Sequence, residues 1–191
     1  MENLAVPFTV SVPDPVALYV AAMRRELRSS AGFTWTNLVA ASQYCLQNKT
    51  NLEEALVWAR NAADPQRFGG QESFATLSNL GALQAANGLE ADAKKTMDKA
   101  LGHPTASAFD IHGYARQLQA QGKAQEAMDV FLLNAQRHPG QWPVSFGLAR
   151  GYAGLGKKKE AIEQPKRALA EPPHEPNRRN IEAFIQQLQG G

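Results

Sequence analysis

The chain has 191 residues, a formal net charge of +2, 43% hydrophobic residues and 20% charged residues. Because the net charge is small, the composition gives no reason to expect binding to nucleic acid or to an anionic membrane. Cys45 is the single cysteine, which excludes an internal disulfide and a thiolate metal cluster. No apolar run reaches the length of a membrane-spanning helix, so we expect no membrane insertion.

Residues 1–13 are expected to form a short strand. Four apolar side chains at period two would share one buried face, and these are Val6, Phe8, Val10 and Val12. Pro7 cannot donate a hydrogen bond to a neighbouring strand, which indicates an edge position. The sequence indicates no partner strand elsewhere, so we interpret this segment as the remnant of a preceding β domain.

Residues 14–72 are expected to form divergent helices and a loop. Asp14 followed by Pro15 is a common helix start, with Asp as the capping residue and Pro at the first helical position. Helices are predicted to about residue 28, then over 34–48 and 51–63, before a loop over 64–70. The segment that begins at Asn51 resembles the repeated turns described next, with its Gly replaced.

Three turns recur at a fixed interval. Gly88, Gly122 and Gly156 are evenly spaced, and each is followed by an acidic residue and then an Ala. Their spacing equals the unit length of the tetratricopeptide repeat, about 34 residues, which forms a helix pair that stacks into a solenoid. The array predicts helices over 73–87, 89–101, 107–121, 123–136, 142–154 and 157–170.

Positions within these helices also resemble the tetratricopeptide family. The fourth, seventh and eighth places of each first helix hold Leu77, Leu80 and Gly81, then Ile111, Tyr114 and Ala115, then Ser145, Leu148 and Ala149. Each second helix carries the family's small residue, at Ala93, Ala127 and Ala161, and then a bulkier one, at Met97, Phe131 and Pro165. The resemblance implies an all-α, right-handed solenoid with three repeats over 73–174. Pro165 is expected to kink the last of these helices, because it removes a backbone hydrogen bond.

Residues 175–191 are expected to cap the array with a helix over about 177–189. Its apolar stripe holds Ile181, Phe184, Ile185 and Leu188, and its other face is polar. A solenoid needs such a helix because its last repeat has no neighbour.

The run from Val6 to the segment around Trp58 resembles a bacterial family that joins a β domain of unknown function to a C-terminal tetratricopeptide array. Members of that family are typically exported. This resemblance implies that the chain is a fragment of such a protein, with an exported or periplasmic location. Separately, an unpaired strand edge could mediate self-association of the chain. A free-standing chain would be cytoplasmic.

No catalytic motif is present, and we expect neither an enzyme nor a bound cofactor or metal. The sequence lacks a His-Glu-x-x-His pair and a Gly-x-Ser-x-Gly elbow, and Gly147-x-x-x-Gly151 falls inside a predicted helix. Cys45 is expected to be a buried small side chain. Three of the four histidines stand beside Pro near helix ends, where an imidazolium meets the negative end of a helix: His103, His138 and His174. The lysines at 157–159 are interpreted as a solvated helix start.

By analogy with the family, one side of each first helix lines a concave groove. The resulting peptide-binding candidates are Asn79, Phe109, His112, Arg116, Phe146 and Arg150. Arg116 and Arg150 are one repeat apart, so we expect them to be neighbours that take a carboxylate or an acidic peptide segment. The predicted function is a protein-interaction module with a protein or peptide partner. The alternative is a structural accessory that packs against a missing β domain.

Overall fold

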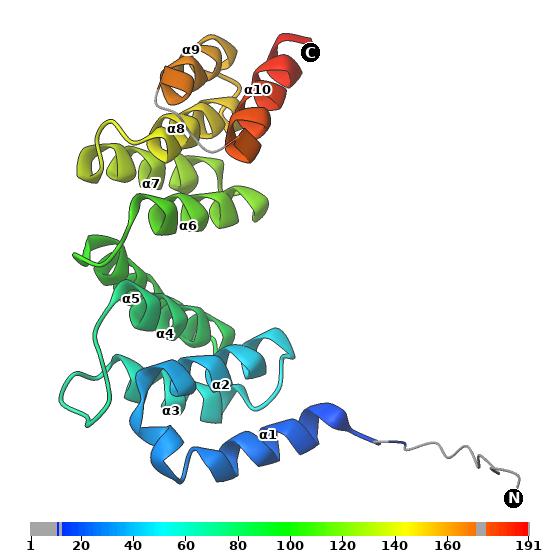
Figure 1. Ribbon diagram of the computed structural model, residues 1–191, viewed down its shortest axis with the longest axis vertical. Helices are drawn as coiled ribbons and strands as arrows, with labels where there is room; N and C mark the ends of the chain where they lie inside the picture. The colour runs from blue at the N-terminus through cyan, green and yellow to red at the C-terminus, as the bar shows by residue number, and fades with distance from the viewer. Residues whose placement is uncertain (1–10, 12, 171–174, 191) are drawn as a thin grey trace, which may run out of the picture. The chain divides into compact units, whose positions relative to one another are not determined.

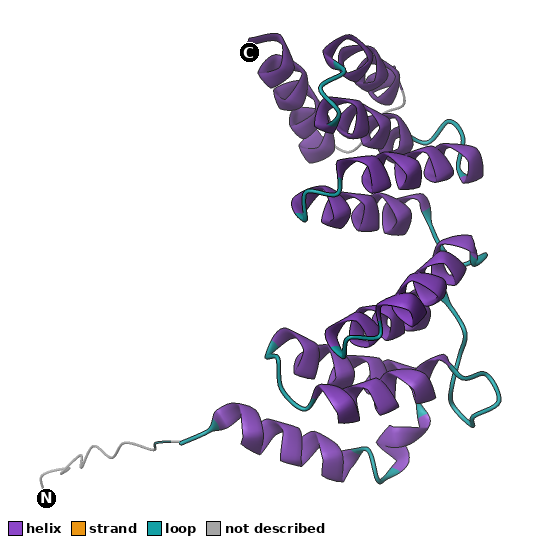
Figure 2. Cartoon of the chain, turned by 180° about the vertical axis from the view of Figure 1, so that it is seen from behind, coloured by secondary structure: helices purple, strands orange, loops and turns teal. Residues whose placement is uncertain are grey.

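The computed structural model describes residues 11, 13–170 and 175–190, and this part of the chain contains helices and no strand (Figure 2). The helices are α1 (Pro15–Glu26), η1 (Ser30–Phe33), α2 (Trp35–Gln47), α3 (Leu52–Ala63), α4 (Phe74–Ala86), α5 (Glu90–Gly102), α6 (Ala108–Ala120), α7 (Ala124–Arg137), α8 (Trp142–Gly154), α9 (Lys158–Ala170) and α10 (Glu175–Gly190) (Figure 1). The all-α architecture is therefore confirmed. The strand expected within residues 1–13 falls almost wholly outside the described residues.

The chain divides into two compact units, Met1–Ala100 and Leu101–Gly191. In the first unit, α2 packs on both α3 and α4, and α1 lies beside α2. In the second unit, each helix packs on the next in chain order, from α6 to α10 (Figure 1).

The repeat period is visible in the helix starts. The first helices of three successive pairs begin at Phe74, Ala108 and Trp142, at equal steps that match the spacing of the three turn glycines. The pair before them begins at Trp35, and the step from Trp35 to Phe74 is longer than the period. The longer step contains the extended loop between α3 and α4, where the sequence predicted an insertion.

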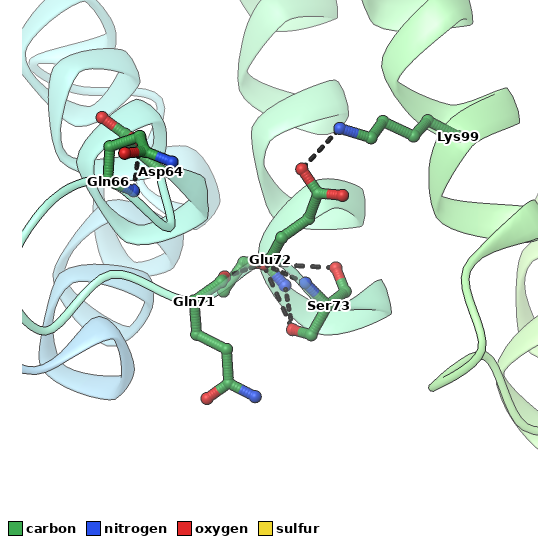
Figure 3. Close-up of polar contacts among 7 residues, drawn as sticks. Asp64, Gln66, Gln71, Glu72, Ser73 and Lys99 are labelled. Atoms are coloured by element: carbon green, nitrogen blue, oxygen red, sulfur yellow. Dashed lines mark hydrogen bonds and ion pairs between the residues drawn. The ribbon is translucent and has the colours of Figure 1, made fainter.

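Local polar contacts hold that loop. The backbone N–H of Gln66 donates to Oδ1 of Asp64 at 2.9 Å, and Lys99 of α5 forms an ion pair with Glu72 (Figure 3). Ser73 then caps α4, since its Oγ accepts from the backbone N–H of Thr76 while Thr76 Oγ1 accepts from the backbone N–H of Ser73. The end of the insertion is thus tied to α4 and α5.

The repeated turns share one hydrogen-bond pattern. Gly88, Gly122 and Gly156 have φ values of +75°, +78° and +73°, and the residue after each donates its N–H to the carbonyl five residues back. This is the Schellman motif, which favours Gly because an L side chain is strained at positive φ. In the first pair Lys49 occupies this place with φ +51°, and Thr50 donates to Cys45. Lys49 therefore occupies the place that Gly holds in the other turns. The sequence analysis had started this turn at Asn51, slightly later in the chain.

Replacing Lys49 with Gly should stabilise the chain by about 0.5 kcal/mol. Gly relieves the backbone strain of a left-handed residue, which stabilises the folded state. This effect is larger than the destabilisation that arises because Gly increases the conformational entropy of the unfolded chain. Gly122→Ala is the reciprocal change at the matching place of another turn, and it should destabilise by about 1 kcal/mol. Urea unfolding of both variants measures these differences, and a less stable Lys49→Gly chain would contradict the assignment.

The core of the first unit joins α1 to the first helix pair. It includes Val20 and Met23 of α1, Leu38 and Cys45 of α2, and Trp58 of α3. Arg24 of α1 also forms a two-pronged ion pair with Glu54 of α3, with contacts of 2.7 and 2.6 Å. These hydrogen bonds hold the pKa of the Glu54 carboxyl below its usual range. Helix α1 is therefore an integral part of the unit.

The core of the second unit centres on Phe131 of α7, which is 1% exposed. Two glycines of α8 let that helix approach the ring. A Cβ at Gly147 would lie 2.6 Å from Cδ1 of Phe131, and a Cβ at Gly151 would lie 2.5 Å from Sδ of Met128. The Gly147-x-x-x-Gly151 sequence is thus a packing surface inside a helix.

Gly147→Ala should destabilise the chain by about 1–3 kcal/mol, because the added methyl group overpacks the contact with Phe131. Gly113 of α6 is the control, since a Cβ there meets no atom within 4 Å. Gly113→Ala should instead stabilise by about 0.5–1 kcal/mol through helix propensity. Thermal unfolding measures the change in melting temperature of each variant. Equal changes in the two variants would refute the close approach of α7 and α8.

The sequence predicted a kink at Pro165 in the last repeat helix. The structure assigns one helix, α9, on both sides of this proline, over Lys158–Ala170.

The sequence also predicted a capping helix at the end of the array. Helix α10 packs on α9, and its Ile181 is completely buried against Phe146 of α8. The polar face of α10 is exposed, at Arg178, Arg179, Glu182, Gln186 and Gln187. A helix that covers the last pair while presenting a polar face to solvent fits the predicted cap.

Candidate functional site

Five of the six predicted groove residues lie in the second unit, on α6 and α8. Each helix has a defined start: Ser107 and Asp110 form a reciprocal cap at α6, and Pro143 stands in the first turn of α8. Because both helices begin at the same repeat position, residues one period apart occupy equivalent places. The structure thereby brings His112 against Phe146 and Arg116 near Arg150.

His112 is largely buried between the two helices. Its ring stacks on Phe146 with centroids 6.1 Å apart and lies 5.5 Å from the Phe131 ring. Nδ1 is 3.1 Å from the carbonyl oxygen of Pro143, so the neutral ring donates that proton to α8. Burial lowers the pKa of His112 to about 4, and the positive charges of Arg150 and Arg116 contribute. The imidazole is therefore neutral at physiological pH and serves as packing.

Arg150 is the central cation of this surface. Its guanidinium carbon lies 4.9 Å from the ring centre of Phe146 and 5.3 Å from that of Phe184 on α10. Burial and the nearby charge of Arg116 lower the pKa of Arg150 from its usual value. Its Nε is buried and has no hydrogen-bond partner among the described residues. One donor of the guanidinium is therefore left unused.

Arg116 lies one repeat before Arg150 and is exposed. No carboxylate of the described chain lies within ion-pair distance of either arginine. Two adjacent guanidiniums without a counter-ion repel each other, and a bound anion would relieve that repulsion. The geometry can therefore accept a carboxylate with a charge-assisted hydrogen bond.

An aromatic rim lies about two helical turns before the arginines, on the same two helices. Phe109 of α6 is 58% exposed, and its ring meets Trp142 of α8 edge to face at 5.5 Å. Phe146, in contrast, is only 7% exposed because α10 covers it. The accessible part of the candidate site therefore comprises Phe109, Trp142, Arg116 and the outer edge of Arg150.

Asn79 lies in the first unit and is packed inside it. Its side chain is 4% exposed, and Nδ2 donates to Oγ of Ser42 on α2 at 2.8 Å. The family analogy assigned this position to the groove, whereas the structure uses it to join the first helices of two adjacent pairs.

Known proteins share the sequence pattern and the fold of this chain. The profile of the tetratricopeptide repeat family matches residues 110–138, which hold most of α6 and all of α7. The chain carries a tetratricopeptide repeat. The crystal structure of MamA is similar to this chain with a TM-score of 0.51 and 15% identity, over 81% of this chain and 87% of that chain. This likeness shows a shared helical fold.

Two further solved structures resemble the chain at lower TM-scores. A second MamA crystal structure has a TM-score of 0.49 and 14% identity, over 81% of each chain. A Podosopora anserina putative kinesin light chain, described as having nearly identical TPR-like repeats, has a TM-score of 0.48 and 18% identity, over 93% of this chain and 87% of that chain. No curated protein sequence matches the chain.

Sequence reasoning missed three contributors to the site. Trp142 forms the rim, Phe184 of the capping helix covers Arg150, and Gln119 donates Nε2 to the backbone carbonyl of Arg150 at 2.8 Å. The period placed Trp142 at the start of a first helix, but the equivalent place of the preceding repeat holds Ala108, which gave no sign of an aromatic contact there. Phe184 carried no signal of this kind, because it lies outside the repeats.

The remaining candidates have structural roles. His138 lies 2.9 Å from the carbonyl oxygen of Ala106, and Arg137 donates to the carbonyls of Leu101 and His103 at the end of α5. Cys45 is buried, and burial raises the pKa of its thiol. Among the described residues, no cluster of His, Cys, Asp and Glu could hold a metal ion. None of the described helices has the length and apolarity needed to cross a bilayer.

Acidification should weaken the fold through His112. Its pKa of about 4 in the folded chain lies below the ordinary value of 6.5, so the unfolded chain binds the proton more tightly. The contribution of neutral His112 to the free energy of unfolding is therefore fully present above pH 6.5, and it is lost as the pH falls toward 4. Between pH 7 and pH 5, His112 alone should remove about 2 kcal/mol from the free energy of unfolding.

His112→Gln should flatten this dependence while keeping a donor for the Pro143 carbonyl. Urea unfolding of the variant and of the wild-type chain at both pH values measures the difference. An unchanged slope in His112→Gln would show that the ring does not titrate as described.

Proposed function

We propose that the chain is a non-catalytic protein-interaction module that binds a carboxylate-bearing peptide segment across α6 and α8. The tetratricopeptide fold supports a protein partner, since stacked helix pairs present extended binding surfaces. One observation carries the proposal: Arg116 and Arg150 are adjacent cations with no counter-ion among the described residues. The partner supplies the missing negative charge.

The surroundings of the arginines support a peptide rather than a free anion. Arg150 is oriented by Phe146 and Phe184, so little side-chain entropy is lost when it binds. The exposed ring of Phe109 and its neighbour Trp142 provide an apolar surface about two helical turns from the charges. A segment that carries both an acidic and an apolar side chain satisfies both features.

Selection of a random peptide library on the immobilised full chain should enrich Asp and Glu beside apolar residues. Arg116→Glu should then weaken a selected, fluorescently labelled peptide by about tenfold or more, because a charge-assisted hydrogen bond becomes a repulsion. Fluorescence anisotropy measures the dissociation constant. Arg116 is exposed, so this variant should fold normally.

Lys158→Glu is the matched control, since it makes the same charge change on an exposed helix start of the same unit. It should leave the dissociation constant within about twofold, as expected for a distant screened charge. Arg150→Lys keeps the charge but loses the planar fork, and an intermediate loss is expected. Acid-poor selected peptides, or wild-type affinity in Arg116→Glu, would refute the proposal.

The alternative function is a structural accessory to a β domain. The period-two apolar pattern of residues 6–12 supports it, since a lone strand needs a sheet to pair with. In that case the groove is an ordinary solvated surface, and Arg116→Glu has no effect on any selected peptide. The same experiment therefore separates the two functions.

A further inference from the structure

A second concave surface lies in the first unit, between α1 and α2. The cleft has a volume of about 450 Å³, within the usual range for a ligand site of roughly 300–1,000 Å³. Tyr19, Met23 and Leu27 form one wall, and Ala40 and Tyr44 of α2 form the other. This surface belongs to neither the arginine groove nor the repeat pattern.

The cleft has one formal charge. Glu26 is the only ionisable acid or base among its lining residues apart from the two tyrosines. Arg24 of the same helix pairs with Glu54 on α3, and neither Arg24, Arg25 nor Arg28 lines the cleft. Glu26 is therefore the formal charge that a ligand in the cleft would meet. Glu26 is exposed and has no ion-pair partner among the described residues.

Two tyrosines stand beside this carboxylate. Tyr19 is 52% exposed, and its ring lies 4.6 Å from that of Tyr44 at an interplanar angle of 57°. Tilted rings of this kind offer a π face to a cation, and a neighbouring carboxylate adds to the attraction. The pair favours a flat or extended cation, as in arginine, over an anion.

Amide side chains complete the lining. Asn37, Gln43 and Gln47 contribute to the cleft wall from α2, and each offers both a donor and an acceptor. Donors and acceptors in alternation suit the backbone of an extended peptide. Met23 and Leu27 supply the apolar floor for a neighbouring side chain.

We propose that the cleft between α1 and α2 binds a peptide segment in which an arginine is flanked by apolar residues. The guanidinium lies against Tyr19 and Tyr44 and pairs with Glu26, while an apolar neighbour contacts Met23 and Leu27. The charge preference is opposite to that of the arginine groove, so the two surfaces recognise different segments. This site is independent of the proposed function of the second unit.

Three short peptides test the chemistry on the ¹⁵N-labelled full chain: acetyl-Leu-Arg-Leu-amide, its citrulline analogue and its glutamate analogue. The arginine peptide should shift the backbone amide signals of Gln43, Tyr44 and Gln47 in a saturable titration. Citrulline keeps the shape without the charge, so its affinity should be about fivefold lower, the size expected of an exposed ion pair with a cation–π contact. The glutamate peptide should not bind.

Two exposed substitutions locate the site without disturbing the core. Glu26→Gln should reduce the affinity for the arginine peptide about threefold and narrow its advantage over citrulline to the cation–π contribution that the tyrosines retain. Ala40→Trp should fill the cleft and remove the shifts. Glu53→Gln, on the exposed face of α3, is the matched charge control and should bind as the wild type does.

Three results would overturn the proposal. Shifts of equal size with the glutamate peptide would show that the cleft does not select a cation. Unchanged affinity in Glu26→Gln would remove the carboxylate from the site, and the absence of shifts with the arginine peptide would show that the cleft does not recognise arginine. None of these results bears on the arginine groove, whose own test uses different peptides and variants.

Discussion

The candidate groove depends on the burial of Phe131. Its ring fills the space that two glycines leave on α8, and it also contacts the His112 ring of α6. A side chain of α7 therefore contacts both α6 and α8 and fixes the distance between them. His112 in turn stacks on Phe146, and Phe146 orients Arg150. The groove cation is thus positioned by a chain of packed rings that begins in the core.

The same packing determines which side chains of the candidate groove are charged. A protonated His112 would add a third cation beside Arg116 and Arg150, and burial keeps the ring neutral instead by lowering its pKa. The two arginines remain charged and mutually repulsive, with aromatic faces as their partial compensation. A protein that retains such repulsion on its surface gives up some stability. The binding of an anion is one way in which that stability is recovered.

Much of the fold could be predicted from the sequence, because the period and the turn residues act locally. The helix starts at Phe74, Ala108 and Trp142 follow directly from the spacing of the glycines. The site was less predictable, since a repeat position does not by itself say whether a side chain faces the groove or the next helix. His112 and Phe146 occupy equivalent places, yet one packs on the next repeat and the other beneath the capping helix. The cleft at α1 had no sequence signal, because it arises between a repeat and a helix outside the period.

Trp142 gives the molecule a built-in optical reporter. Of the three tryptophans, Trp35 and Trp58 belong to the first unit, so Trp142 is the single indole of the second. Its ring stands at the rim against the exposed Phe109. The emission of an indole shifts with the polarity of its surroundings, and covering this rim would exclude water from it. In a chain whose other two tryptophans are replaced by phenylalanine, the wavelength of the emission maximum would report the solvent exposure of this one surface.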